Sequence, residues 1–231
     1  MRKGYEGTGP GAITPDGCSV ELYDRLAAGE EPGIVAAAAP AGGTLLELGS
    51  GAGRLTGPLG ERGFTVTAVD ESAEMLERLR RRTPGVTTVR SPIETLDLPE
   101  RFDVVLLASF LVHAGEHRVR DALLATCRRH VKDDGCVLIQ REGPDAHTRL
   151  PREWVDPAGY TVRIVSAEPV GDGVDSVFAE YVFPDARWTQ TFLSRPLTEE
   201  DFERYADQAG LAVDAYLTDD RTWVRTRPKE R

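Results

Sequence analysis

The fold of this chain is decided by the stretch Thr44-Leu45-Leu46-Glu47-Leu48-Gly49-Ser50-Gly51-Ala52-Gly53-Arg54-Leu55. Its apolar first half predicts a buried strand, and the residues that follow predict a glycine turn and then a helix. Gly49, Gly51 and Gly53 lack the Cβ atoms that keep a backbone away from a ligand, and they tolerate positive φ angles. We therefore expect a ligand to lie directly on the main chain here.

A second apolar strand follows at residues 65–69 and ends in Asp70. In nucleoside-binding folds an acidic side chain at this place accepts the hydroxyls of a ribose. A dinucleotide fingerprint counted from Gly49 would require a glycine where the chain has Arg54. The glycine spacing therefore disfavours a nucleotide-dependent oxidoreductase.

This order of features resembles motif I of the class I S-adenosylmethionine-dependent methyltransferases, in which an acidic residue precedes three alternate glycines, here Glu47 to Gly53. The resemblance covers most of the chain, because it continues through Asp70, the segment 91–96, the strand 102–108 and the turn into a strand near Cys136. It implies an α/β fold with a Rossmann-like, seven-stranded, mostly parallel sheet. An antiparallel final hairpin and a small antiparallel β cap complete the expected fold.

The length of 231 residues suits a single methyltransferase domain over residues 1–231. Its expected parts are an N-terminal arm or lid (1–30), a cofactor-binding core (40–142), a substrate-cap insertion (143–197), and a final helix and hairpin (198–231). The first residues, to about position 17, are rich in Gly, Thr and Pro without an apolar period, which predicts a mobile arm. The cap is expected to hold three strands, near 160–167, 176–183 and 188–192.

Charge and composition exclude several function classes. The net charge of −10 and the pI near 5.0 disfavour a nucleic-acid partner, which requires a basic face. The three cysteines are scattered without metal-ligand spacing, so neither a disulfide framework nor a metal site is expected. No apolar run reaches the roughly 18 residues of a membrane helix. We expect a cytoplasmic protein without membrane contact, and the sequence leaves room for an oligomer.

The resemblance implies S-adenosyl-L-methionine as the cofactor, held by the glycine turn and by residues at the ends of the strands. The expected cofactor-binding residues are Tyr23, Glu47, Gly49, Ser50, Gly51, Gly53, Asp70, Glu71, Met75, Ile93, Glu94 and Ala108. In the family a tyrosine ahead of motif I reaches the methionine end of the cofactor, although a packing role for Tyr23 is an equal alternative. The adenine contact falls to the Ile93 backbone and Glu94, because Pro92 occupies the usual acidic position.

His113 is the candidate catalytic residue. It follows the fourth strand at the edge where open α/β sheets bind their ligands, and imidazole is suited to general base chemistry. Methyl transfer requires in-line positioning, and a base is needed only when the acceptor has a proton to lose. The alternative for His113 is a structural, hydrogen-bonded histidine. His147, in the expected cap, either lines the pocket or faces water.

Three further residues are candidates for the substrate pocket. Tyr5 is the aromatic residue of the expected lid, and Trp188 is one of several aromatic residues in the expected cap. Arg141, at the tip of the fifth strand, has the geometry to bind a substrate carboxylate in bidentate fashion. Packing within the cap and an ordinary salt bridge are the alternatives for Trp188 and Arg141, respectively.

The sequence thus predicts an S-adenosylmethionine-dependent methyltransferase that acts on a small molecule, such as an intermediate of natural-product biosynthesis. Nitrogen, oxygen and carbon acceptors all remain open, since the fold does not determine the reaction. The main alternative is a non-catalytic module that binds S-adenosylmethionine or S-adenosylhomocysteine, because the glycine turn and Asp70 would serve both functions equally.

Overall fold

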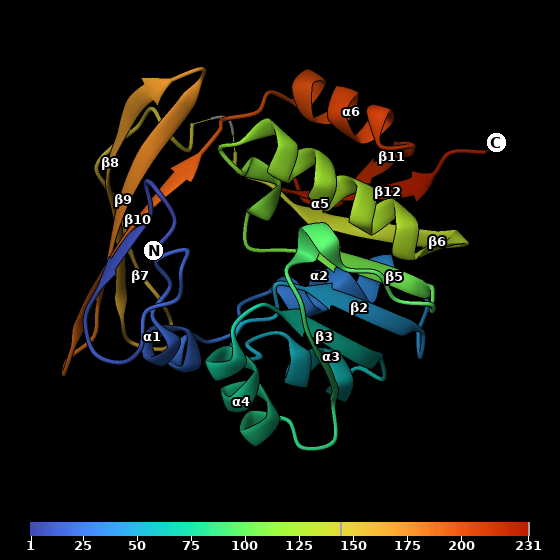
Figure 1. The fold of residues 1–231 in the computed structure, drawn as a ribbon, viewed down its shortest axis with the longest axis horizontal. Helices are drawn as coiled ribbons and strands as arrows, with labels where there is room; N and C mark the ends of the chain where they lie inside the picture. Colours follow the sequence, from blue (N-terminus) through green and yellow to red (C-terminus); the bar gives the residue numbers. More distant parts are fainter. Residues whose placement is uncertain (144, 231) are drawn as a thin grey trace. The chain divides into compact units, whose positions relative to one another are not determined.

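The computed structural model describes residues 1–143 and 145–230. The chain divides into two compact units, of which the small unit comprises Met1–Ala27 and Pro144–Pro196. The large unit comprises Ala28–Gly143 and Leu197–Arg231. Each unit is built around a β-sheet of its own, with seven strands in the large unit and five in the small unit (Figure 1).

The sheet of the large unit has the strand order β11-β12-β6-β5-β2-β3-β4 (Figure 1). Its strands are β2 (Thr44–Leu48), β3 (Thr65–Asp70), β4 (Thr87–Arg90), β5 (Phe102–Leu107), β6 (Val131–Gln140), β11 (Leu211–Tyr216) and β12 (Trp223–Pro228). The neighbours from β6 to β4 are parallel, whereas β12 is antiparallel to both β6 and β11. The predicted Rossmann-like sheet with an antiparallel final hairpin is therefore confirmed.

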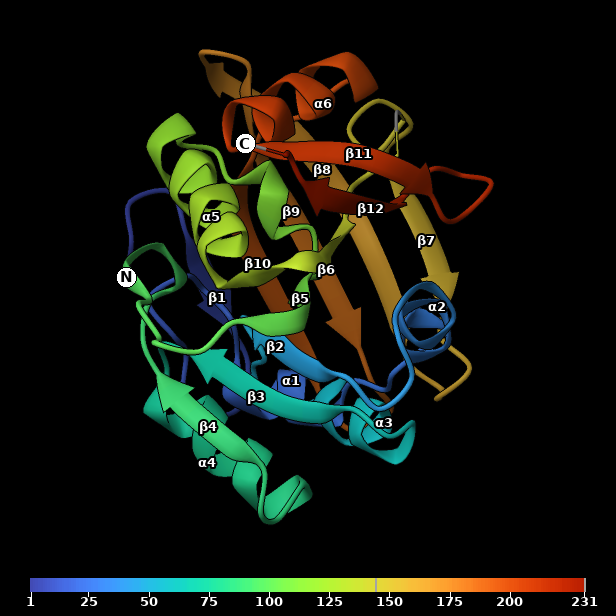
Figure 2. The same cartoon turned by 90° about the vertical axis from the view of Figure 1, so that its right-hand side faces the viewer.

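Helices cover both faces of this sheet, as a parallel sheet requires (Figure 2). The helices of one face are α5 (His117–His130) and α6 (Glu199–Gln208), and those of the other are α2 (Glu31–Ala38), α3 (Thr56–Glu61) and α4 (Ala73–Arg82). Along β2, Leu46 and Leu48 pack into the first layer and Leu45 into the second. Burial on both faces explains why the strands are continuous apolar runs without polar alternation.

The ends of these helices follow local sequence signals, with one exception. Ser72 caps α4 by accepting a hydrogen bond from the Met75 N–H, and Thr198 caps α6 through the Asp201 N–H. The helix that follows the glycine turn, α3, begins only at Thr56 and has no side-chain cap. Gly53 has a φ of 84°, which lies outside the right-handed helical region, so the turn extends further than the glycine pattern predicts.

The small unit contains an antiparallel sheet with the order β1-β10-β9-β8-β7 (Figure 2). Its strands are β1 (Glu6–Thr8), β7 (Arg152–Val155), β8 (Thr161–Gly171), β9 (Val174–Val182) and β10 (Arg187–Ser194). The three long strands match the three predicted for the cap. The prediction of an irregular N-terminal arm is wrong in part, since Glu6–Thr8 pairs with β10. Because this pairing depends on β10, a strand far along the chain, the local sequence around Glu6–Thr8 does not predict it.

Among the described residues, no helix combines the length and the apolar character needed to cross a membrane.

Candidate functional site

The glycine turn lies at the carboxyl edge of the large sheet, directly after β2. Gly49, Gly51 and Gly53 all have positive φ angles, of 71°, 55° and 84°. A Cβ atom on Gly49 would lie 2.8 Å from Leu111 Cδ1, and one on Gly53 would lie 2.8 Å from Leu79 Cγ. At Gly49 and Gly53, therefore, both the positive φ angle and the close packing require glycine, as the sequence predicts.

Asp70, the last residue of β3, fixes this turn in place. Its Oδ2 accepts the Gly51 N–H at 2.8 Å, and its Oδ1 accepts the Ser72 N–H at 2.8 Å. These two bonds hold the carboxylate in a fixed orientation at the carboxyl edge of the sheet, where parallel sheets bind their ligands. The role of Asp70 toward ribose hydroxyls stays a prediction.

Two buried polar groups lie within the same turn. Ser50 Oγ is buried and has no hydrogen-bond partner among the described residues, which marks it as an acceptor or donor for a bound group. Glu47 is 3% exposed, and its Oε2 accepts a hydrogen bond from Thr56 Oγ1 at 2.6 Å. Burial raises the pKa of Glu47 to about 7. Glu47 thus supports the turn from the interior of the protein.

The features of this edge fit S-adenosylmethionine. The turn is bare of side chains at three positions, the Ser50 hydroxyl is unsatisfied, and the Asp70 carboxylate is oriented by two backbone amides. Nucleoside groups combine hydroxyl donors with a flat apolar surface, and this donor and acceptor set is matched to them.

The other predicted cofactor residues fall into two groups. Six positions of the large unit follow or flank the carboxyl ends of β3, β4 and β5, where parallel sheets bind ligands: Glu71, Met75, Ile93, Glu94, Ala108 and the Asp70 carboxylate. Met75 is 3% exposed and packs in the core, so only a small part of its side chain is accessible to a cofactor. Tyr23 belongs to the small unit, where its hydroxyl donates to Gln190 Oε1 at 3.3 Å, and its cofactor role stays a prediction.

His113 is a buried, hydrogen-bonded residue, and its role as a catalytic base stays a prediction. It is 3% exposed and lies in the 3₁₀ turn η2 (Leu111–His113). Its Nε2 accepts the Glu142 N–H at 2.8 Å, and its Nδ1 lies 3.7 Å from Glu142 Oε2. Because a backbone amide occupies the ring lone pair, the geometry supports the structural alternative.

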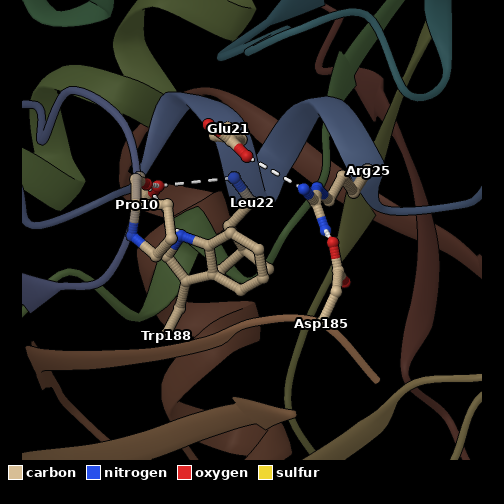
Figure 3. Close-up of polar contacts among 7 residues, drawn as sticks. Pro10, Glu21, Leu22, Arg25, Asp185 and Trp188 are labelled. Atoms are coloured by element: carbon tan, nitrogen blue, oxygen red, sulfur yellow. Dashed lines mark hydrogen bonds and ion pairs between the residues drawn. The ribbon is translucent and has the colours of Figure 1, made fainter. Parts of the chain in front are cut away.

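The contacts of Trp188 favour packing within the small unit, and its substrate role stays a prediction. Its side chain is fully buried, and its indole N–H donates to the Pro10 carbonyl at 2.9 Å (Figure 3). The Arg25 guanidinium, on α1 (Val20–Arg25), lies 5.1 Å from the indole ring and bonds Asp185 (Figure 3). The indole therefore anchors the N-terminal segment to β10.

Arg141 is likewise committed to the protein interior. It is 3% exposed, its Nη2 donates to the Leu197 carbonyl at 2.7 Å, and its guanidinium lies 5.4 Å from the Phe202 ring. These contacts attach the start of α6 to the end of β6. They favour a structural role, and the predicted bond to a substrate carboxylate stays untested. Tyr5 is half-buried just before β1, and its substrate role stays a prediction.

Two consecutive residues after β5, neither of them predicted as a site residue, have a strained backbone. Ser109 and Phe110 are not glycines but have φ angles of 54° and 60°. Gln140 Oε1 holds the Ser109 N–H at 2.8 Å, and the Phe110 side chain is 43% exposed. Backbone strain of this kind is common at functional sites. No local sequence pattern predicts the positive φ angles of these two residues.

Comparison with known proteins agrees with this geometry. A protein-family model described as "Methyltransferase domain" matches residues 45–135. The chain is 32% identical over 152 residues to a cypemycin N-terminal methyltransferase of Streptomyces sp, covering 58% of this chain and 61% of that protein. It is 28% identical to the dTDP-3-amino-3,6-dideoxy-alpha-D-glucopyranose N,N-dimethyltransferase of Streptomyces fradiae, covering 83% and 78%.

Among solved structures, the fold is similar to that of CalS10, an amino pentose methyltransferase from Micromonospora echinaspora with bound SAM. The TM-score is 0.71 at 21% identity, and the match covers 90% of this chain and 95% of that one. The glycine turn, the strand order and the matched domain lead to one assignment. The chain contains a methyltransferase domain, matched over residues 45–135, and it has the fold of the S-adenosylmethionine-dependent methyltransferases, enzymes whose cofactor is S-adenosyl-L-methionine.

Proposed function

We propose that this protein transfers a methyl group from S-adenosyl-L-methionine to an amine nitrogen of a small molecule in natural-product biosynthesis. The observation that carries this proposal is the glycine turn, in which Asp70 is fixed by the Gly51 and Ser72 amides beside the unsatisfied Ser50 hydroxyl. When bound, the cofactor supplies an electrophilic methyl carbon on a sulfonium. The turn and Asp70 orient the nucleoside half of the cofactor.

The choice of nitrogen as the acceptor rests on two supports. Two curated relatives are named a cypemycin N-terminal methyltransferase and an N,N-dimethyltransferase of a nucleotide-linked amino sugar, and CalS10 is named an amino pentose methyltransferase. Other curated relatives are named ubiquinone biosynthesis O-methyltransferases, so the acceptor atom needs the experiment below. In addition, the amide on His113 Nε2 removes the base that a hydroxyl acceptor would need at that edge. A neutral amine attacks without losing a proton first, so its methylation requires no general base in the large unit.

A pair of matched acceptors tests this proposal. The full chain is incubated with methyl-labelled S-adenosylmethionine and either a nucleotide-linked amino sugar or the corresponding sugar with a hydroxyl in place of the amine. A peptide with a free α-amine, and the same peptide acetylated, form a second pair. We expect label only in the amine members. Label in a hydroxyl member would overturn the choice of nitrogen.

The non-catalytic alternative makes a different prediction for the same samples. A binding module would bind S-adenosylhomocysteine in a calorimetric titration but transfer no label to any acceptor. Binding of NAD instead would favour an oxidoreductase and overturn the assignment of the glycine turn.

The proposed setting is the cytoplasm, with no nucleic-acid partner. The three cysteines are free thiols, which fits a reducing compartment, and the net charge of −10 disfavours phosphate backbones.

A further inference from the structure

Three side chains of α5 hold the backbone of the segment that follows β4. They occupy positions 126, 129 and 130, so they lie on one face of the helix. Their bonds go to main-chain groups: Thr126 Oγ1 and Arg129 Nη1 donate to the carbonyls of Ile93 and Leu96, and His130 Nε2 accepts the Leu98 N–H. The course of residues 93–98 is therefore fixed from α5.

Thr126 acts at the start of this segment, in the 3₁₀ turn η1 (Ile93–Thr95). Its side chain is fully buried, and its Oγ1 lies 3.0 Å from the Ile93 carbonyl oxygen. The same oxygen accepts the Leu96 N–H at 3.2 Å. A carbonyl oxygen has two lone pairs, and both are used within the protein here. Any polar contact of the Ile93 backbone with a ligand must therefore come from its N–H.

The turn η1 lies beside the glycine turn and beside Asp70. A Cβ atom on Gly49 would lie 3.5 Å from Ile93 Cδ1, and the Ser91 N–H donates to the Asp70 carbonyl at 3.1 Å. All of these residues belong to the large unit. A nucleoside whose ribose is held by Asp70 therefore has its base next to η1. The half-buried Ile93 side chain offers the apolar surface that a flat base requires.

We propose that Thr126 is a positioning residue that makes the cofactor site selective for adenine, because it holds the Ile93 N–H in place for a purine ring nitrogen. N1 of adenine is an acceptor and pairs with an N–H group. N1 of hypoxanthine carries a hydrogen, so the two donors would oppose each other. This inference rests on the methyl donor of the proposed function and is independent of the choice of acceptor.

The experiment measures the affinity of the full chain for two ligands by calorimetric titration. They are S-adenosylhomocysteine and S-inosylhomocysteine, in which hypoxanthine replaces adenine. We expect the wild type to prefer the adenine ligand by about 10- to 100-fold, because the other base leaves a donor unpaired. Thr126→Val keeps the shape of the side chain but removes the hydroxyl. It should weaken S-adenosylhomocysteine binding by about 10-fold and change S-inosylhomocysteine binding by less than about twofold.

Two further variants separate positioning from general damage. Thr126→Ser keeps the hydroxyl and should retain the wild-type preference for adenine. Thr226→Val, on β12, removes a buried hydroxyl that has no hydrogen-bond partner among the described residues, and it should change neither affinity. Equal weakening of both ligands in Thr126→Val would overturn the proposal, because it would show that the whole site is loosened. Unbound S-inosylhomocysteine would report the same damage.

A measurement without ligand tests the positioning role directly. The Leu96 N–H shares the Ile93 carbonyl with Thr126, so its hydrogen exchange reports how firmly η1 is held. We expect this amide to exchange about 10-fold faster in Thr126→Val than in Thr126→Ser. Equal exchange rates would overturn the proposal.

The same titrations keep this inference separate from the proposed function. A wild type that binds the adenine and hypoxanthine ligands equally would overturn the inference even if amines are methylated. A wild type that shows the expected preference, and loses it in Thr126→Val, but methylates no amine would contradict the proposed function alone.

Discussion

The two units use their polar side chains in different ways. In the large unit, several buried polar side chains hold the backbone: His113 accepts the Glu142 N–H, His130 accepts the Leu98 N–H, and Arg141 donates to the Leu197 carbonyl. In the small unit, polar side chains mainly pair with one another. Glu180 binds both Arg163 and Arg187 there.

The two kinds of contact have different effects on the structure. A side chain that binds backbone amides fixes the course of the chain, and the bond depends little on which residues flank it. In the small unit, by contrast, the pairs of Glu180 with Arg163 and Arg187 connect β9 to its two neighbouring strands.

The largest expected effect comes from Trp188→Ala. Removal of a fully buried indole should destabilise the small unit by about 3–5 kcal/mol. Hydrogen exchange should report it as a loss of protection in the β9 and β10 amides but not in β2 and β5. Trp154→Ala, at a side chain that is 45% exposed, is the matched control. Equal loss of protection in both sheets would show that the units are not energetically distinct.

The next effect concerns the pH dependence that Glu47 imposes on the large unit. Burial raises the pKa of Glu47 from 4.5 to about 7 in the folded state, so the folded protein binds the proton more tightly than the unfolded chain. The contribution of this group is fully present below about pH 4.5 and is lost as the pH rises through 7. A shift of about 2.5 pH units corresponds to about 3 kcal/mol.

Glu47→Gln should remove this dependence. Denaturant unfolding at about pH 5 and pH 8.5 measures it, with Glu61→Gln, an exposed residue at the end of α3, as the control. If the wild type and Glu47→Gln lose the same free energy of unfolding over this range, Glu47 is not the responsible group.

Asp70→Asn should have a smaller effect, on the cofactor rather than on the fold. The substitution removes the charge and replaces one acceptor oxygen by an amide donor, which disturbs the Gly51 and Ser72 bonds as well as any ribose contact. We expect S-adenosylhomocysteine affinity to fall by about 10- to 100-fold in a calorimetric titration. Asp172→Asn, in the turn between β8 and β9, should leave the affinity unchanged. Unaltered affinity in Asp70→Asn would refute the ribose assignment.

The smallest effect is expected for Thr198→Ala. Loss of the cap on α6 should cost about 1 kcal/mol in the free energy of unfolding. Thr95→Ala, an exposed residue of η1 (Ile93–Thr95), provides the comparison. A change in the small-unit amides rather than in α6 would contradict the local origin of this stabilisation.

Local signals explain what could be predicted for the site. The glycine turn after β2 and Asp70 at the end of β3 are marked by residue type and spacing, and the strand order places them at one edge. The roles of His113 and Trp188 were not predictable in this way. His113 binds an amide 29 residues away, and Trp188 binds a carbonyl 178 residues away.

The sequence by itself determined the sheet of the large unit, the glycine turn, the acidic residue after β3 and the cap of α6. Each depends on contacts within a few residues or on a repeating apolar pattern, which a linear chain displays. Only the tertiary structure decided that Arg141 turns into the interior, because that depends on a distant acceptor reaching the guanidinium. The partner of Arg141 is the Leu197 carbonyl, 56 residues along the chain, and no periodicity connects the two.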